Sequence, residues 1–495
     1  MTTTPPAAVQ MHPPRYKALV LILLLAAYTF NFIDRTIIST IGQAIKVDLK
    51  ISDTQLGLLG GLYFALLYTI LGIPVARLAE RFSRTWIITV SLVLWSGFTA
   101  LCGTATSFAG LAAMRFGVGV GEAGLGPSAP SLISDFYEPR KRASALSVYS
   151  LGIPLGTMFG AIVGGYLAQY VSWRVAFFAV GLPGVILAIA FKFVVTEHVR
   201  GGAYVVETPR IAEDVSAPPV KRGLAYEFSE FGAVAKTLFG VWPVFHMMAG
   251  ITLASFASYG VNGFVPPFFI RTLGLGLAQA GLVFGLLQGL ANGAGTLLGG
   301  FLTDRLGRRN PAWYALVPAI GIAIACPLYI TAYLQSSWQM AAAVLILPGI
   351  LHYTYLAPTF AVIQNSVDVR RRATATALLF FVLNLIALGG GPPFVGWLID
   401  SLAQWNFGHP GAHSPLTSLF GMIGGHDAAF LKDCPGGAAP KGSAAALVAS
   451  CKTTLSESTR QGVVLGSVIY AWAALHYFLA AIGMKRHMQR RIAPS

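Results

Sequence analysis

Long apolar stretches, separated by short polar segments, recur along the whole sequence. Each stretch is roughly 20 residues or longer, which is the length that a helix needs to cross about 30 Å of hydrocarbon. A membrane β-barrel would instead show short segments of alternating polarity. The pattern therefore predicts an all-α integral membrane protein with twelve spans, at 17–42, 54–77, 85–106, 108–135, 143–169, 173–195, 240–271, 278–303, 311–334, 337–366, 373–400 and 461–484.

A polar stretch in the middle of the chain divides the twelve predicted spans into two groups of six. We expect an N-terminal six-helix bundle in 1–196 and a C-terminal bundle in 240–495. Between them, a cytoplasmic linker at 197–239 is predicted to contain a short surface helix near 224–238. The C-terminal bundle includes a long Gly-, Ala- and Ser-rich loop at 401–459.

Charge is scarce in this chain and lies mostly between the apolar stretches. Hydrophobic residues make up 55% of the sequence and charged residues only 11%, whereas soluble domains are about a quarter charged. The net charge of +15 could suggest nucleic-acid binding, but the basic residues lie in short loops. We therefore interpret them as the signal that orients a membrane protein, with Lys and Arg on the cytoplasmic side.

The loop charges predict which side of the membrane each loop faces. If the N-terminus is inside, clusters of arginines fall in the inner loops, and few basic residues fall in the short outer loops. The outer ones are Lys46, Lys50, Arg174 and Arg271. Both termini are then cytoplasmic, in a bacterial inner membrane. The outer loop at 401–459 would hold Cys434 and Cys451 in an oxidising compartment, where a disulfide can form.

Two loops of the first half are repeated at nearly the same offset in the second half. Residues 76–85, after the second predicted span, match 300–309, after the eighth, in an acid, the Arg that follows it and a later Arg. Residues 141–145 match 371–375 in two successive basic residues and the small residues that follow them. Two such matches indicate duplicated halves related by an axis along the membrane normal.

The repeated loops also offer a conformational latch, in which a carboxylate pairs with guanidinium groups across the cytoplasmic helix ends. The alternative interpretation is that these arginines only set the topology. The candidate latch residues are Glu80, Arg81, Arg84, Arg142, Asp304, Arg305, Arg308 and Arg372.

The segment 300–309 resembles the signature loop of the major facilitator superfamily, and 76–85 resembles a degenerate copy of that loop. The resemblance extends over the whole chain. It implies two pseudo-symmetric six-helix bundles that work by alternating access as a secondary transporter, with no cofactor and no enzymatic activity.

Four charged residues fall well inside the predicted spans: Asp34, Arg35, Arg115 and Glu122. An intramembrane charge costs at least about 2.5–3.5 kcal/mol, so such residues are paired and mark functional sites. From the helical rise, Asp34 and Arg115 come to similar depths, and Glu122 lies two turns from Arg115 on the same face. We expect one cluster between the first and fourth predicted helices.

This cluster can be interpreted as a combined proton and anion site. A carboxylate beside an Arg stays ionised, whereas one in a dry pocket takes up a proton more readily. Asp34 and Glu122 are then the candidate proton carriers. Arg35 and Arg115 either partner them or hold a substrate anion. The alternative is a static salt bridge that fixes the two helices together.

The surrounding residues resemble the spinster-like branch of the superfamily, which includes sphingolipid and lysophospholipid transporters, some of them proton-driven. The similar segments are 31–35, 115–123 and 152–156. The resemblance implies that Asp34 and Glu122 serve coupling. It also implies that Arg35 and Arg115 serve coupling or head-group binding. Anion–proton symporters of the superfamily carry a similar stretch in their first helix, so both substrate classes stay open.

The second half offers aromatic and amide side chains, rather than charges, at the depth of this cluster. A cavity between the halves would be charged on one wall and aromatic or amide-bearing on the other, which suits an amphiphile and also a small aromatic acid. The candidate lining residues are Asn31, Phe256, Tyr259, Asn262, Gln288, Asn292, His352, Tyr355, Phe381 and Asn384.

These observations predict a proton-coupled transporter of a lipid-like or amphiphilic molecule, acting as a monomer among membrane lipids. The alternatives are a proton-driven symporter of small organic acids, aromatic or sugar-derived, and a membrane sensor that binds ligand without moving it. A lipid-modifying enzyme is a third class, but no nucleophile–base arrangement, metal-ligand cluster or phosphate loop stands out in the sequence.

Overall fold

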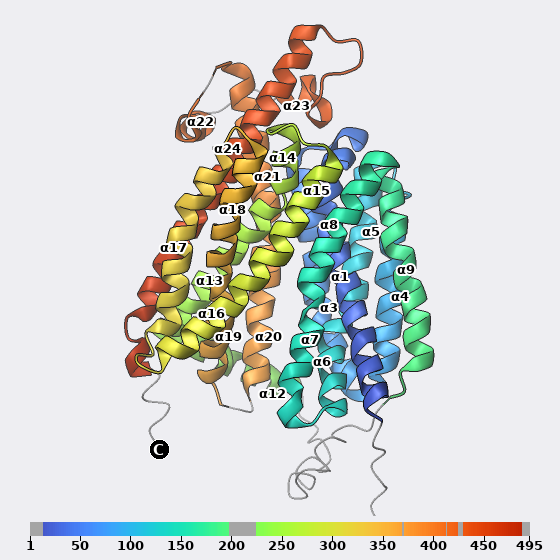
Figure 1. The fold of residues 1–495 in the computed structure, drawn as a ribbon, viewed down its shortest axis with the longest axis vertical. Helices are drawn as coiled ribbons and strands as arrows, with labels where there is room; N and C mark the ends of the chain where they lie inside the picture. The colour runs from blue at the N-terminus through green and yellow to red at the C-terminus, as the bar shows by residue number, and fades with distance from the viewer. Residues whose placement is uncertain (1–12, 198–223, 369–370, 412, 424–428, 488–495) are drawn as a thin grey trace, which may run out of the picture.

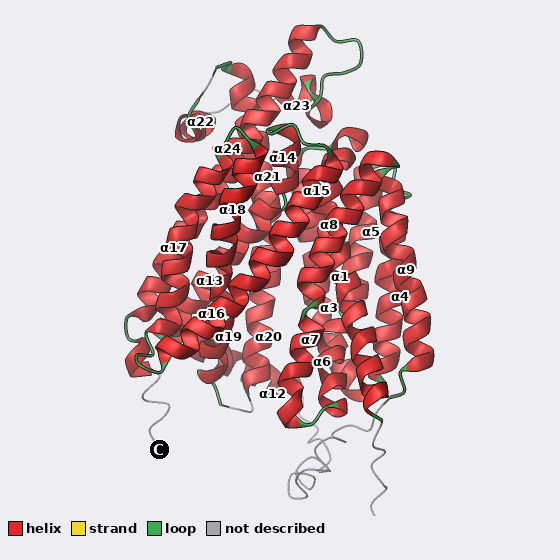
Figure 2. Ribbon diagram, in the orientation of Figure 1, coloured by secondary structure: helices red, strands yellow, loops and turns green. Residues whose placement is uncertain are grey.

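The computed structural model (Figure 1) describes residues 13–197, 224–368, 371–411, 413–423 and 429–487. Nearly all of these residues are helical, and no strand occurs among them (Figure 2). Eleven helical stretches in the described residues are long and apolar enough to cross a membrane. The remaining predicted span, the fourth, consists of two successive shorter helices, α5 (Phe108–Glu122) and α6 (Leu125–Phe136).

The first six spans form one bundle and the last six form a second bundle beside it (Figure 1), which confirms the predicted fold class. The first bundle comprises α1 (Pro14–Leu49), α2 (Asp53–Gly60), α3 (Leu62–Arg81), α4 (Arg84–Cys102), α5, α6, α7 (Pro139–Ser150), α8 (Gly152–Tyr170) and α9 (Trp173–Val194). The second comprises α13 (Trp242–Asn262), α14 (Val265–Arg271), α15 (Leu277–Leu286), α16 (Asn292–Gly307), α17 (Trp313–Tyr333), α18 (Trp338–His352), α19 (Leu356–Asn365), α20 (Arg372–Val382), α21 (Gly389–Gly408) and α24 (Ala445–Ala481).

The two ends of the molecule carry different additions. One end, here called the capped end, bears α22 (Pro415–Ile423), α23 (Ala429–Asp433), the turn η5 (Pro435–Gly437) and the first turns of α24 (Figure 1). At the opposite end, the linker end, α1 begins and α12 (Leu224–Gly240) lies. The helix predicted in the linker is α12, while 198–223 lies outside the described residues.

The structure corrects the predicted extent of the 401–459 loop. The last two spans both reach further than predicted, because α21 continues to Gly408 and α24 begins at Ala445. Hydropathy marks only the part of a helix that lies in lipid, so the polar first turns of α24 are not distinguished from a loop by that criterion.

Several spans are interrupted, and the interruptions have local causes. Gly61 adopts a non-helical conformation between α2 and α3. Pro266 and Pro267 stand in the first turn of α14, where a proline costs no backbone hydrogen bond. Two π-helical turns, η1 (Leu287–Ala291) and η4 (Leu383–Leu388), interrupt the spans that contain α15 and α20. Such turns are rare and often mark functional sites.

The two bundles touch through close helix pairs, α8 with α15 and α2 with α21. In the α8–α15 pair, Gly281 faces the backbone of the other bundle so closely that a Cβ there would lie 2.4 Å from the Ala161 carbonyl oxygen. Small residues allow this approach because lipid gives helices little hydrophobic reason to associate and packing must supply the attraction.

At the linker end, a buried arginine ties three segments of the first bundle together. Arg84, at the start of α4, forms an ion pair with Asp135 of α6 and bonds Ser131 at 3.1 Å. It also pairs with Glu197, just after α9, at 2.9 Å. Burial alone would raise the pKa of the Glu197 carboxyl, but hydrogen bonds from the Thr85 amide, the Ser83 hydroxyl and Arg84 outweigh it and lower that pKa. Arg84 therefore holds the first bundle together at this end.

We expect Gly281→Ala to lower the melting temperature of the purified protein, because its methyl group would strike the backbone of α8. Overpacking of this kind costs about 1–3 kcal/mol. The control is Gly293→Ala, since nothing lies within 4 Å of the added methyl at that position. Equal melting temperatures for the two variants would contradict the close approach of α8 and α15.

We expect Glu197→Gln to lower the melting temperature at neutral pH, because it removes the charged partner of Arg84. The folded-state pKa of Glu197 lies below its ordinary value of 4.5. Its contribution to stability is therefore complete above that pH and is lost as the pH falls through the folded pKa. The gap between wild type and variant should close in acid, whereas Glu138→Gln, which removes no capping bond, should show no such gap.

Candidate functional site

The structure brings the four charged residues predicted inside the membrane into one cluster at mid-depth. Asp34 and Arg35 lie near the middle of α1, and Arg115 and Glu122 lie two turns apart on α5. Asp34, Arg115 and Glu122 are each 1% exposed, while the Arg35 side chain is 19% exposed. Arg35 is therefore the member of the cluster that solvent or a ligand can reach.

Arg35 and Glu122 form an ion pair that joins α1 to α5. The Nε and Nη2 atoms of Arg35 each lie 2.8 Å from the same Glu122 oxygen, Oε2. The other oxygen, Oε1, is buried and has no hydrogen-bond partner among the described residues. Arg35 therefore holds Glu122 through one carboxylate oxygen only.

Arg115 and Asp34 are neighbours without a direct ion pair between their side chains. Arg115 donates from Nε to the Leu59 carbonyl at 3.1 Å and from Nη1 to the Asp34 backbone carbonyl at 3.5 Å. The Asp34 carboxyl lies near Arg115 and Thr99, yet its Oδ1 and the Arg115 Nη2 have no hydrogen-bond partner among the described residues. The alternative considered from the sequence was a static salt bridge between the two helices. Arg35 and Glu122 form such a bridge, but Asp34 takes no part in it.

Aromatic rings of α1 and α3 surround Arg35. Its guanidinium carbon lies 5.1 Å from the ring centre of Phe32, 4.9 Å from that of Phe64 and 4.7 Å from that of Tyr68. Phe64 also lies under Arg115, at 5.3 Å. The negative faces of aromatic rings attract cations, so this cage stabilises both guanidinium groups. Phe64 and Tyr68 are not predicted from the sequence, because aromatic residues in an apolar span do not stand out from their neighbours.

Part of the predicted lining of the second bundle faces the cluster. Tyr259 of α13 is 41% exposed at the middle of the molecule and lies close enough to Arg35 and Tyr68 to interact with them electrostatically. Arg35 of the first bundle and Tyr259 of the second are therefore within electrostatic reach of each other across the boundary between the bundles.

Three predicted amide residues of the second bundle form a hydrogen-bonded ladder. Gln288, on the π-helical turn η1, donates to Asn262 at 2.9 Å, and Asn262 donates to the Ser258 hydroxyl at 3.2 Å. Asn292 donates to Gln288. All three amides are partly exposed, so the ladder presents donors and acceptors without any charge.

Other predicted lining residues lie elsewhere. His352 and Tyr355 are buried in a cluster of rings, where the Tyr329 hydroxyl bonds His352 at 3.0 Å and Ser255 bonds Tyr355 at 3.0 Å. These two residues stabilise the second bundle and do not line an open space, which corrects the sequence prediction. Asn31 is buried beside Glu122. Phe256, Phe381 and Asn384 are partly buried.

The described hydrogen bonds of two candidate latch residues, Arg142 and Arg372, each stay within one bundle. Arg142 bonds the Ser134 carbonyl at 2.8 Å within the first bundle, and Arg372 bonds Asn365 at 3.3 Å within the second. The side chain of Glu80 lies outside the described residues. The remaining candidates other than Arg84 are exposed: Arg81, Asp304, Arg305 and Arg308. The latch stays a prediction, while Cys434 and Cys451 are joined by a disulfide at the capped end.

Comparison with known proteins agrees with this architecture. A model of the Major Facilitator Superfamily matches residues 24–392 and 247–484. An MFS-type efflux pump of Mycolicibacterium smegmatis is 32% identical over 79% of this chain and 87% of its own length. A sphingosine-1-phosphate transporter of Xenopus tropicalis is 26% identical over 81% of this chain and 79% of its own.

A solved structure covers almost the entire chain. It is a bacterial homologue of the human lysosomal transporter spinster, in an inward-facing and unoccupied conformation. The two share 30% of their residues and superpose with a TM-score of 0.78, over 98% of this chain and 100% of the other. The chain belongs to the Major Facilitator Superfamily, as a spinster-like transporter.

Proposed function

We propose that this protein is a proton-coupled secondary transporter that carries an amphiphilic molecule by alternating access. The observation that carries the proposal is the Arg35–Glu122 ion pair, which lies at mid-depth, faces the second bundle and is partly accessible. A ligand or a proton can break such an ion pair. Either event changes the net charge of the first bundle at the surface that faces the second bundle.

The coupling follows from the charge balance of the pair. While Arg35 holds Glu122, the positive and negative charges of the ion pair compensate each other. An anionic head group that draws Arg35 away leaves a buried carboxylate without its cation, and the protonated form is then favoured. Asp34, which lies beside Arg115 but forms no ion pair with it, provides a second carboxyl that can exchange a proton with the cluster.

The asymmetry between the two bundles supports an amphiphilic cargo. The first bundle supplies a caged cation, Arg35, for an acidic or phosphate-bearing head group. The second supplies Tyr259 and the uncharged amide ladder, which can receive a neutral part of the molecule. The resemblance to a sphingosine-1-phosphate transporter fits a single-chain lipid with an anionic head.

We further propose that the linker end faces the cytoplasm of a bacterial cell and the capped end faces the outside. The arginine-rich loops 76–85 and 300–309 lie at the linker end, as expected for cytoplasmic loops. The Cys434–Cys451 disulfide lies at the capped end, as expected for an oxidising compartment.

The head-group assignment can be tested by thermal stability of detergent-purified protein with lysophospholipids, sphingoid bases and small aromatic acids. A ligand that binds the native state raises the melting temperature by mass action. We expect a rise with anionic single-chain lipids that disappears in Arg35→Ala and persists in Arg174→Ala, a partly exposed arginine paired with Asp48. A rise with small acids alone would instead support the organic-acid symporter.

The coupling assignment can be tested in proteoliposomes with the ligand that shifts the melting temperature. We expect Asp34→Asn and Glu122→Gln to abolish transport driven by a pH gradient while each variant still folds and inserts. Asp48→Asn, which removes an exposed carboxylate, should transport like the wild type. Normal proton-driven transport by both cluster variants would leave only a structural role for the cluster.

A further inference from the structure

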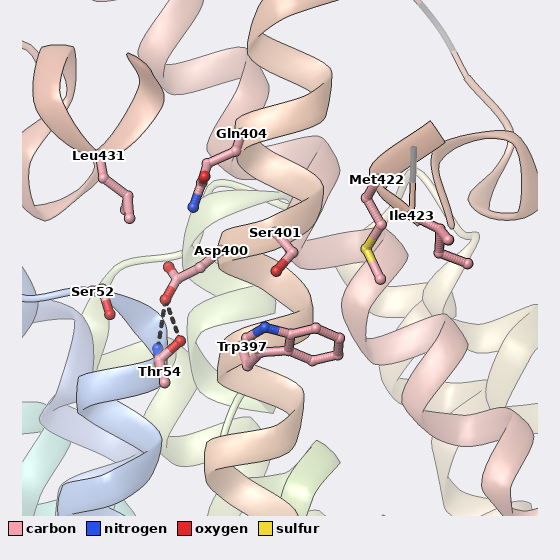
Figure 3. Close-up of a pocket in the computed structure, with 9 residues that line it drawn as sticks. All are labelled: Ser52, Thr54, Trp397, Asp400, Ser401, Gln404, Met422, Ile423 and Leu431. Carbon is pink, nitrogen blue, oxygen red and sulfur yellow. Dashed lines mark hydrogen bonds between the residues drawn. The ribbon is translucent and has the colours of Figure 1, made fainter. Parts of the chain in front are cut away.

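A carboxylate of the second bundle caps a helix of the first bundle at the capped end. Asp400 of α21 accepts from the Asp53 amide at 2.9 Å through Oδ1, and from the Thr54 amide at 2.7 Å through Oδ2. The Thr54 hydroxyl adds a third bond at 2.6 Å (Figure 3). The first amides of a helix have no partner within the helix and attract negative charge. Asp400 therefore binds α2 across the boundary between the bundles.

The Asp53 side chain, one residue into α2, forms ion pairs with cations from both bundles. Its Oδ2 lies 2.8 Å from Lys46 Nζ at the end of α1. Its Oδ1 lies 2.8 Å from Arg271 Nη2 at the end of α14. Arg271 also bonds Thr459 at 3.1 Å. The three charged side chains are at most 3% exposed.

We call these four residues the outer charge network: Lys46, Asp53, Arg271 and Asp400. The network contains two cations and two carboxylates, so it is neutral as a whole, and each bundle contributes one of each sign. A neutral network can stay buried, whereas separation of the bundles would leave each part with unpaired groups. The network is therefore stable only when the bundles are together at this end.

The disulfide-linked turn of the cap lies directly on this network. The disulfide joins Cys434, next to η5, to Cys451 of α24. In η5, Gly436 and Gly437 have positive φ angles of 70° and 84°, which side chains rarely adopt. A Cβ at Gly436 would lie 2.8 Å from the Lys46 carbonyl oxygen, and one at Gly437 would lie 3.1 Å from Lys46 Cε. The turn, which belongs to the second bundle, thus covers Lys46 of the first bundle.

A small pocket reaches the network from the capped end. It has a volume of about 320 Å³ and lies between α2, α21 and the cap, with Trp397 and Met422 on its walls and Asp400 at its polar side (Figure 3). Water can therefore approach Asp400 as soon as the bundles loosen, which allows the network to open as well as close.

We propose that the outer charge network is the extracytoplasmic gate of the transporter, and that the disulfide-linked turn is a strap that holds this gate closed. The inference rests on the proposed function, because a gate on this side is meaningful only for a protein that alternates between two openings. It assigns roles to residues outside the mid-depth cluster, and it requires no particular substrate.

Hydrogen–deuterium exchange of the full-length protein in detergent, without substrate, tests the gate. In Asp400→Asn we expect severalfold faster exchange in the segments 51–56 and 264–276, because the α2 amides lose their acceptor and the bundles part at the capped end. At the linker end, the segments 76–86 and 300–310 should exchange more slowly, because the bundles close there. Asp48→Asn, an exposed carboxylate of the same end, should match the wild type.

The double variant Cys434→Ser/Cys451→Ser tests the strap, and we expect the same pattern with smaller amplitude. Faster exchange at both ends would mean a loss of fold and would overturn the proposal, and so would unchanged exchange in Asp400→Asn. Since no substrate or proton gradient is used, these outcomes are separate from those of the thermal-shift and transport experiments. If those experiments fail while the exchange pattern appears, the gate stands and the proposed cargo or coupling is wrong.

Discussion

Charge buried away from water is the constraint on which the rest of this structure depends. Lipid outside and packed side chains inside leave an ion with few ways to be solvated: a partner ion, a backbone dipole or an aromatic face. The mid-depth cluster and the outer charge network use all three, through the Arg35–Glu122 pair, the α2 amides at Asp400 and the ring of Phe64. The helix packing around them serves to keep these partners in place.

The two groups of charges differ in a way that suits two roles. The outer charge network crosses between the bundles, and the Asp53 and Asp400 carboxylates accept through both oxygens. The outer charge network therefore changes state only when the contacts between the bundles break. The mid-depth cluster lies within one bundle, and one oxygen each of Asp34 and Glu122 has no hydrogen-bond partner among the described residues. In the proposed coupling this cluster changes its charge by taking up a proton, whereas the outer charge network changes only by opening or closing.

The fold and the mid-depth cluster could be predicted from the sequence because both are evident from residue type alone, without knowledge of which residues pair. Apolar runs reveal spans, and a charge inside a run is conspicuous. The outer charge network is not evident in this way, since Lys46 and Arg271 lie at or beyond the ends of predicted spans, where a charged residue is not conspicuous. Asp400 likewise stands at the predicted end of a span. Their meaning depends on pairing between segments far apart in the chain, which a single sequence does not show.

The errors in the predicted lining have a similar origin. His352 and Tyr355 are polar residues at the expected depth, but depth does not say whether a side chain points to the space between the bundles or into its own bundle. The structure turns both inward, onto Tyr329 and Ser255. Gln288 and Asn262 are instead partly exposed and bond each other, and the π-helical turn at Gln288 changes the helical phase in a manner that no regular periodicity predicts.

One helix connects the two groups of charges. Arg35 and Lys46 are both on α1, and the distance between them in the sequence is about three helical turns, so they lie on nearly the same face and about 16 Å apart. A helix is stiff over three turns, so in the proposed coupling a tilt or rotation of α1 after the loss of the Arg35–Glu122 pair would also displace Lys46 from Asp53. Conversely, a closed strap over Lys46 would restrain α1 at the position where Arg35 meets Glu122. The shared helix α1 is thus the connection through which the proposed proton site and the proposed gate would act on each other.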